Sequence, residues 1–173
     1  PLAGRVVARR IRKAMGLDCA RLFGSGTAPI SPAMLAWFAR LGIPISEGWG
    51  MTETTGLSCS NHPYRADWVG TIGKPLDCVE MNLSPHGEIL VRGDQVCAGY
   101  WNDPEATAAS RLGPWLRTGD VGRLVDGLLH VVDRKKDLII TGGENVASRE
   151  VEDLVSLHPA VAQVAVVGVP DDR

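Results

Sequence analysis

Residues 21–46 read RLFGSGTAPISPAMLAWFARLGIPIS, and this stretch decides the fold class. Arg21–Phe23 predicts a short strand that leads into the glycine turn Gly24-Ser25-Gly26. The pair Ser31-Pro32 predicts the start of a helix, because serine caps helix N-termini and proline suits the first helical position. Ile43–Ser46 predicts the next strand. A strand, a helix and a strand in this order indicate an α/β unit.

Short β runs separated by tight turns follow this unit. They are Val79–Leu83, Glu88–Arg92, Val121–Val125 and Leu128–Val132. The dipeptide Asp126-Gly127 joins the last two runs, and Asp-Gly between apolar runs is a strong signal for a β-hairpin. We therefore expect a β-rich part after the α/β unit.

A third pattern begins after Asp133. Leu138–Thr141 predicts a strand, and Ser148 is a natural cap for a helix that continues to His158. The apolar run Ala160–Val169 predicts a further strand. This return to alternating strand and helix indicates a separate small domain.

Together these patterns predict a mixed α/β (α+β) fold with two domains. The first domain, residues 1–135, has an α/β part at 1–68 and a β-rich part at 69–135. The second domain, residues 136–173, is α+β.

The composition of the chain argues against several kinds of partner. Its 173 residues carry a formal net charge of −2 with a pI near 6.1, so it lacks the basic excess typical of proteins that bind nucleic acid or anionic lipid. The four cysteines lie far apart without a Cys-x-x-Cys pair, so we expect reduced thiols and no structural zinc. Val161–Val169 is too short to span a bilayer. We therefore expect no integral membrane segment and a cytoplasmic protein.

The N-terminal segment is basic and amphipathic and has two interpretations. Its basic residues are Arg5, Arg9, Arg10, Arg12 and Lys13. Such a segment could be a transit peptide or a helix on a membrane surface. We favour a solvated helix that lies over a core and ends near Gly16, because glycine commonly terminates helices. Since residue 1 is proline, we expect the sequence to begin inside a longer or processed chain.

The string Gly48-Trp49-Gly50-Met51-Thr52-Glu53 offers an aromatic face, a hydroxyl and a carboxylate in succession. Trp49 stands between two glycines, so no neighbouring side chain in the sequence covers its ring. At the sharp turn that follows, Thr52 can meet a phosphate oxygen and Glu53 can hold magnesium, which prefers oxygen ligands. The alternatives are a tryptophan buried in a core and a solvated helix cap.

Two further charged groups occur later in the chain. Asp120 follows Thr118-Gly119 at the end of a strand, where its carboxylate can accept hydrogen bonds from both hydroxyls of a ribose. Arg134 lies in the run Asp133-Arg134-Lys135-Lys136-Asp137 and can donate several hydrogen bonds to sugar or phosphate oxygens. Taken singly, the first could be a turn aspartate and the second part of a charged loop.

The order of these strings resembles that of the adenylate-forming superfamily, which includes acyl-CoA synthetases, the adenylation domains of peptide synthetases and beetle luciferases. The resemblance extends from about Leu22 to Arg173. Besides the strings above, it rests on the segments Gly24–Pro29, Gly87–Gly93, Gly99–Trp101 and Asp133–Asn145. A chance match would not reproduce so many separate strings in one order.

The resemblance implies a nucleotide site. Its members would be Gly26, Thr27 and Ala28 beside the adenine and the acyl group, then Gly48, Trp49, Gly50, Thr52, Glu53, Asp120 and Arg134. Within it, Trp49 would stack on adenine, and Asp120 and Arg134 would hold the ribose. Thr52 on a phosphate and Glu53 on magnesium would be the catalytic residues.

Two further roles concern the small domain. The resemblance implies that residues 1–135 are the end of a large domain with a barrel-like β part, and that residues 136–173 are the beginning of a small, mobile domain. Lys136 would be the hinge between the two. Gly142 and Gly143 would lie near the passage for the pantetheine of coenzyme A once the small domain rotates.

The resemblance also implies the reaction. A carboxylate attacks the α-phosphate of ATP to give an acyl-adenylate and pyrophosphate, and a thiol, usually that of coenzyme A, then displaces AMP. The runs 26–31 and 142–145 are most similar to synthetases of long-chain or medium-chain acyl-CoA, so we expect a fatty acid as the small-molecule partner. The alternatives are a non-catalytic nucleotide-binding or scaffold module with the same fold, and an unrelated β-rich interaction domain.

Departures from the family pattern bear on activity. Trp49 stands where the family has tyrosine, which keeps stacking but removes the phenolic hydroxyl, and Ser148 replaces a proline before the acidic helix. We expect the phosphate loop with its lysine to precede Pro1, and the catalytic lysine of the small domain to follow Arg173. The chain alone should therefore show little or no ligase activity.

Overall fold

The computed structural model of the chain describes residues 2–169, with side chains from residue 4 onward. It divides into two compact units, each built from segments that are separate in the sequence. The first unit comprises Pro1–Glu80, Gly93–Gly99 and Leu124–His130, and the second comprises Met81–Arg92, Tyr100–Arg123 and Val131–Arg173. The predicted domain boundary after residue 135 stays a prediction.

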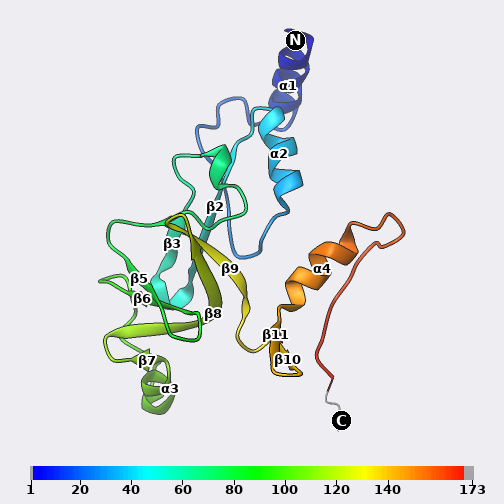
Figure 1. The fold of residues 1–173 in the computed structure, drawn as a ribbon. Coiled ribbons are helices and arrows are strands. Elements are labelled where there is room, and N and C mark those ends of the chain that lie inside the picture. The colour runs from blue at the N-terminus through cyan, green and yellow to red at the C-terminus, as the bar shows by residue number, and fades with distance from the viewer. Residues whose placement is uncertain (1, 170–173) are drawn as a thin grey trace. The chain divides into compact units, whose positions relative to one another are not determined.

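Figure 1 shows the helices and strands along the chain. In order they are α1 (Leu2–Ala14), β1 (Phe23–Ser25), α2 (Pro32–Arg40), β2 (Ile45–Met51), the 3₁₀ turn η1 (Thr52–Thr54), β3 (Gly56–Ser60), η2 (Ala66–Trp68), β4 (Lys74–Pro75), β5 (Glu80–Leu83), β6 (Glu88–Arg92), α3 (Pro104–Ala109), β7 (Arg111–Leu112), β8 (Trp115–Val125), β9 (Leu128–Arg134), β10 (Ile139–Thr141), β11 (Glu144–Val146) and α4 (Ser148–Ser156). This mixture of helices and sheets confirms the predicted α/β fold class. Among residues 2–169, no helix has the length and apolarity needed to cross a membrane.

The first unit contains a four-stranded sheet in the order β1-β2-β3-β4. β1 and β2 are parallel, and α2 lies between them in the sequence, which confirms the predicted strand-helix-strand unit. The Ser31 hydroxyl accepts a hydrogen bond from the Met34 amide at 3.3 Å, as expected of a helix cap. Leu35 of α2 and Cys59 of β3 are fully buried and belong to the core of this unit.

Helix α1 ends as the sequence predicts. Gly16 has a left-handed φ of 71°, and its N–H donates to the Lys13 carbonyl at 3.1 Å, which closes the helix. The Arg12 guanidinium donates to the Leu41 carbonyl at 2.5 Å, and Ala8 is buried. These contacts favour the interpretation of α1 as a solvated helix packed over a core.

The second unit is built on a sheet in the order β5-β6-β8-β7, and β9 also pairs with β8. Ile89, Leu90 and Val91 of β6 are all buried. Because successive strand residues point to opposite faces, β6 is covered on both sides. Asp126 and Gly127 join β8 to β9 with left-handed φ values of 52° and 77°, as a type I′ turn requires, which confirms the predicted hairpin.

The prediction that Ser148 caps the last helix is wrong. Ala147 occupies the cap position of α4 and makes no side-chain cap bond. The Ser148 hydroxyl instead donates to Asp133 Oδ2 at 2.9 Å, and both residues are buried. Helix α4 begins at Ser148, one residue past the cap position, and the hydroxyl there is bound by the carboxylate at the end of β9. Helix α4 also ends at Ser156 rather than at His158.

The predicted strand over Ala160–Val169 is also wrong. A strand is defined by ladder hydrogen bonds to a neighbour, and β10 and β11 of the described chain pair only with each other. The Val166 N–H donates to the Glu152 carboxylate at 2.8 Å instead. Val169 remains 79% exposed. A run of β-branched residues without a partner strand does not form a strand.

We predict that Ser148→Ala lowers the free energy of unfolding by about 1–2 kcal/mol, because it leaves a buried Asp133 oxygen without its donor. Urea denaturation followed by circular dichroism measures the change. Ser156→Ala is the matched control in the same helix, since its exposed hydroxyl donates only to the Asp153 carbonyl, and it should change stability by about 0.5 kcal/mol or less. Equal losses in the two variants would contradict the prediction.

Candidate functional site

The carboxyl ends of β1 and β2 bring two predicted motifs of the first unit together. The parallel register places Gly26 beside Gly48, and a Cβ on Gly26 would lie 3.1 Å from the Gly48 carbonyl oxygen. Thr27 has a left-handed φ of 66°, and its hydroxyl donates to the Gly26 carbonyl at 2.6 Å. Ligands of α/β sheets bind at the carboxyl ends of parallel strands. The exposed turn through Ala28 therefore lies where a ligand site is expected.

Trp49 is half-buried on β2. It stands between two glycines, and their lack of a side chain leaves room for the neighbouring strand β3. A Cβ on Gly50 would collide with the Gly56 carbonyl oxygen, and a Cβ on Gly48 would lie 2.5 Å from Leu57 Cδ1. The register of β2 against β3 also shifts between Trp49 and Gly50. The glycines thus allow two strands to approach closely, a role beyond leaving the indole uncovered by its neighbours in the sequence.

Thr52 and Glu53 lie in the 3₁₀ turn η1, which confirms that a sharp turn follows Trp49. Thr52 is exposed and Glu53 is half-buried. The turn is anchored by Thr54, whose fully buried hydroxyl accepts hydrogen bonds from the Ser58 hydroxyl at 2.8 Å and from the Met51 amide at 3.2 Å. Thr54 therefore fixes the direction in which the two preceding side chains leave the backbone.

The segment Gly93–Gly99 of the same unit holds the other side of this turn. The Cys97 amide donates to the Glu53 carbonyl at 2.8 Å, and the Thr55 hydroxyl donates to the Gln95 carbonyl at 2.7 Å. The Gln95 side-chain amide donates to the Leu57 carbonyl at 3.1 Å. Hydrogen bonds to this segment thus hold the turn at Glu53 and at Thr55.

In the second unit, Asp120 lies inside β8 and not at a strand end, which corrects the prediction. Leu90 of β6 pairs with Arg117 and Glu88 pairs with Val121, so β8 carries extra residues between these pairs and bulges. The bulge contains the sequence Thr118-Gly119-Asp120. It depends on a pairing partner far away in the sequence, so local patterns could not reveal it.

Side chains and one left-handed residue stabilise the bulge. The Thr118 hydroxyl donates to the Ile89 carbonyl at 2.8 Å and accepts from the Asp120 amide at 3.1 Å. Gly119 has a φ of 74°, which favours glycine. The motif therefore turns the Asp120 side chain out of the regular strand alternation, and that side chain is 17% exposed.

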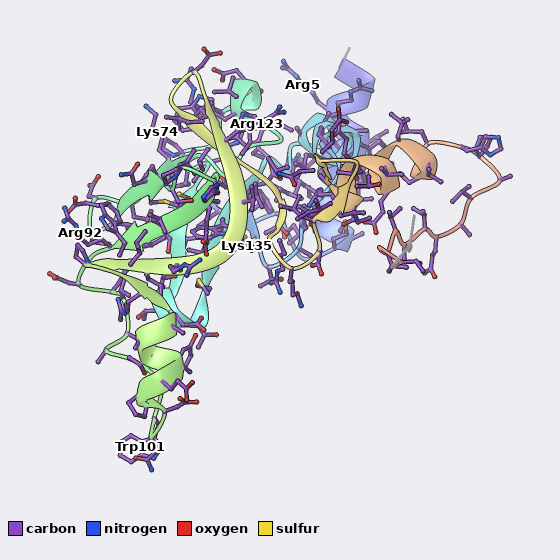
Figure 2. The ribbon with its side chains drawn as sticks, turned by 60° about the horizontal axis from the view of Figure 1, so that its bottom comes forward. Arg5, Lys74, Arg92, Trp101, Arg123 and Lys135 are labelled. Atoms are coloured by element: carbon purple, nitrogen blue, oxygen red, sulfur yellow. The ribbon has the colours of Figure 1, made fainter. Side chains whose placement is uncertain are left out.

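The Glu88 carboxylate lies beneath this bulge and is 8% exposed. Its Oε2 accepts from Arg117 Nη2 at 2.9 Å and from Lys135 Nζ at 3.3 Å, and its Oε1 accepts from the Gly119 amide at 3.3 Å. Lys135, labelled in Figure 2, directly follows β9. Desolvation raises the pKa of Glu88, but the hydrogen bonds and charges of Arg117 and Lys135 outweigh it and lower the pKa.

The structure brings the two predicted ribose residues together. Arg134 Nε lies 3.7 Å from Asp120 Oδ1, and the Arg134 side chain is 64% exposed. The Arg134 amide donates to Asp133 Oδ1 at 2.8 Å, and the Lys135 amide donates to the Gly119 carbonyl at 2.7 Å. Backbone contacts therefore fix the spacing of the pair, while the long exposed guanidinium remains able to rotate toward a ligand.

The remaining predicted residues lie farther along the second unit. Lys136 is exposed in a turn that begins at Arg134, whose carbonyl accepts from the Asp137 and Leu138 amides. Gly142 and Gly143 form the exposed two-residue turn of the β10–β11 hairpin, with φ values of 58° and 83°. Their roles as hinge and as coenzyme A passage stay predictions.

The predicted site is therefore divided between the units. The motifs from Gly26 to Glu53 belong to the first unit, and Asp120 and Arg134 belong to the second. Within each unit the expected neighbours lie close together. That the two groups bind one nucleotide stays a prediction.

Sequence reasoning missed two residues that shape these motifs. Thr54 is one of three threonines around Glu53, and no local signal distinguishes it. Glu88 opens the apolar run that continues to Val91, and a carboxylate at the edge of a buried strand was a signal that it has a charged partner. Both residues act through hydrogen bonds to groups that sequence alone does not bring near.

The donors near η1 fit magnesium bound together with a nucleotide. Glu53 supplies a half-buried carboxylate next to the exposed Thr52 hydroxyl. Magnesium is usually held by one or two carboxylates plus substrate phosphates, and not by a cage of protein ligands. The described residues contain no group of three or more histidine, cysteine, aspartate or glutamate side chains placed to hold a metal ion.

Cys59 offers no competing chemistry. Burial raises the pKa of its thiol to about 12. The thiol is therefore protonated at neutral pH and is a poor nucleophile.

Comparison with protein families decides the membership of the chain. The family model described as AMP-binding enzyme matches residues 6–101, more than half of the chain. The chain belongs to the AMP-binding enzyme family. This result confirms the resemblance to adenylate-forming enzymes that the motifs indicate.

Curated relatives of this AMP-binding enzyme chain include ligases for different acids. It is 40% identical over 163 residues to a 2-succinylbenzoate–CoA ligase of Bacillus cereus, an alignment that covers 88% of this chain and 34% of that protein. It is 38% identical over 166 residues to the long-chain-fatty-acid–CoA ligase FadD15 of Mycobacterium bovis, covering 95% of this chain and 27% of that protein. The chain thus spans about a third of the length of these relatives.

Solved structures support the same family membership. The O-succinylbenzoate coenzyme A synthetase of Bacillus subtilis in complex with AMP matches with a TM-score of 0.82 at 33% identity, covering 97% of this chain and 38% of that one. An amide bond synthetase from Marinactinospora thermotolerans matches with a TM-score of 0.80 at 35% identity, covering 99% of this chain and 38% of that one. The fold of this AMP-binding enzyme chain is therefore shared by a coenzyme A synthetase and an amide bond synthetase.

We predict that Thr54→Val lowers the free energy of unfolding by about 1–3 kcal/mol, because the buried Ser58 hydroxyl and Met51 amide lose their acceptor. Thr55→Val is the control in the same turn, since its hydroxyl is exposed and donates only to the Gln95 carbonyl. It should cost about 0.5 kcal/mol. Urea denaturation monitored by tryptophan fluorescence measures both, and an equal effect of the two substitutions would show that Thr54 does not anchor the turn.

We predict that the stabilising effect of Glu88 depends on pH. Because its pKa in the fold is below the ordinary value of 4.5, the stability it contributes is fully present above that value and is lost as the pH falls through the lowered pKa. At pH 7, Glu88→Gln should lower the free energy of unfolding by about 1–3 kcal/mol. The difference from the unsubstituted chain should shrink at acidic pH. Chemical denaturation at a series of pH values tests this, and a difference independent of pH would refute it.

Proposed function

We propose that this chain is the nucleoside-binding part of an AMP-forming acid–thiol ligase. The proposal rests on the Asp120–Arg134 pair, a carboxylate and a guanidinium that lie 3.7 Å apart at the bulge of β8. The carboxylate can accept from two ribose hydroxyls, and the guanidinium can donate to ribose or phosphate oxygens. The relatives, which are CoA ligases, support this assignment.

The reaction requires positioning more than covalent chemistry by the protein. In the first half, a substrate carboxylate oxygen attacks the α-phosphorus of ATP, the bond to pyrophosphate breaks, and an acyl-adenylate forms. In the second half, a thiol sulfur attacks the acyl carbon, AMP leaves, and the thiol proton passes to solvent. Trp49 would hold the adenine by stacking, and Thr52 would donate to a phosphate oxygen.

Glu53 is the residue that would hold magnesium in this proposal. When bound, the metal ion would supply positive charge against the phosphates of ATP. The half-buried Glu53 carboxylate is suited to this because its turn is fastened by Thr54 and by the Cys97 amide. The chain's own contribution is a fixed direction for the carboxylate.

For the substrates, we propose a fatty acid and coenzyme A, in a cytoplasmic enzyme. The relative that acts on long-chain fatty acids supports the acid, although the 2-succinylbenzoate ligase is equally similar. Lys136 as hinge and Gly142-Gly143 beside the pantetheine complete the proposal. A panel of fatty and aromatic acids, tested for ATP-dependent pyrophosphate release by the chain within a protein of its relatives' length, separates the two acids.

We predict that Asp120→Ala weakens binding of a non-hydrolysable acyl-adenylate mimic by at least about tenfold, because it removes a charged acceptor for the ribose hydroxyls. Isothermal titration calorimetry on the 173-residue chain measures the affinity. Asp94→Ala, at an exposed position of the first unit, is the control and should leave the affinity unchanged.

Two results would overturn the proposal. Loss of affinity in both variants would show that the effect is not specific to Asp120. No binding by the unsubstituted chain would favour the alternative that the fold serves as a scaffold module without a nucleotide site.

A further inference from the structure

The Glu88 carboxylate is fully engaged by donors of its own unit. Arg117 and Lys135 donate to one oxygen, and the Gly119 amide donates to the other. The side chain is 8% exposed. Because the chain itself occupies both oxygens, Glu88 is not placed to contact a ligand.

Two of the donors to Glu88 are sequence neighbours of the proposed ribose-binding pair. Gly119 directly precedes Asp120, and Lys135 directly follows Arg134. The Lys135 amide also donates to the Gly119 carbonyl at 2.7 Å. Glu88 therefore closes a ring of hydrogen bonds that joins the β8 side of the pair to the residues that follow β9.

The bulge explains why a carboxylate is needed at this position. With a φ of 74°, Gly119 turns its amide away from the regular ladder, and Glu88 Oε1 is the acceptor that it reaches at 3.3 Å. A glutamine in the same place has the same shape and one acceptor oxygen, but it does not attract the charges of Arg117 and Lys135. The negative charge, more than the shape, thus holds Lys135 against the bulge.

We propose that Glu88 is a positioning residue for ribose recognition, which holds Asp120 and Arg134 at the spacing that accepts the two ribose hydroxyls without touching the nucleotide itself. This inference rests on the proposed function. It assigns a role in specificity to a residue outside the nucleotide-binding motifs.

The test compares two nucleotides that differ only in the ribose hydroxyls. The affinities of the chain for AMP and for 2′,3′-dideoxy-AMP are measured by calorimetry at pH 7. Glu88→Gln should weaken AMP binding by about tenfold and change dideoxy-AMP binding by less than about twofold, since only AMP has the ribose hydroxyls that the Asp120–Arg134 pair would bind. Glu105→Gln, at an exposed position of α3 in the same unit, should change neither affinity.

A second variant tests whether Glu88 acts through its contact with Lys135. Lys135→Met should also weaken AMP binding and leave dideoxy-AMP binding unchanged. The double variant with Glu88→Gln should bind AMP little more weakly than either single variant, because the two substitutions remove the same Glu88–Lys135 contact. If Glu88→Gln does not fold, as judged by circular dichroism, Lys135→Met carries the same comparison, since its side chain is 52% exposed.

The outcomes separate this inference from the proposed function. Equal losses for both nucleotides would indicate a general structural role and overturn the inference, as would unchanged AMP affinity in Glu88→Gln and Lys135→Met. If the unsubstituted chain binds neither nucleotide, the proposed function itself fails, and with it the site that Glu88 would position.

Discussion

The second unit depends on the buried charge of Glu88. Glu88 lies at the start of β6, where the apolar residues that follow are covered on both faces. A carboxylate in such a place is tolerated only when donors satisfy it, and Arg117, Lys135 and the Gly119 amide do so. Those donors come from β8 and from the end of β9, so one charge fixes how these segments meet. The bulge that presents Asp120 follows from this arrangement.

The first unit fixes its motif by close backbone approach. Gly50 allows β3 to approach β2 where any side chain would collide with Gly56. The buried Thr54 hydroxyl then closes the turn after β2. Each unit has a strand irregularity within a predicted motif: a register shift in β2 between Trp49 and Gly50, and a bulge in β8. The candidate site residues thus lie where the regular ladder is interrupted.

The sequence predicts the features that depend on neighbouring residues. Ser31-Pro32 starts a helix and Asp126-Gly127 turns a hairpin because the required chemistry lies within a few residues. The sequence fails where a distant group supplies the partner. Ser148 lies one residue past the cap position of its helix, and its hydroxyl donates to Asp133.

The same reasoning explains the other misses. Ala160–Val169 is not a strand because no described strand pairs with it. Of the candidate site, the motifs and the closeness of Asp120 to Arg134 agree with the sequence-based expectation. The roles of Glu88 and Thr54 became visible only in three dimensions, because their partners are supplied by folding.

We propose that the predicted motifs bind the adenosine of AMP. The most direct measurement is a titration of the ¹⁵N-labelled chain with AMP, followed by NMR. We expect the Trp49 indole N–H signal, assigned with Trp49→Phe, to shift along one binding curve with the Gly119 and Asp120 amide signals. Shifts confined to one unit, or two curves with different midpoints, would contradict it.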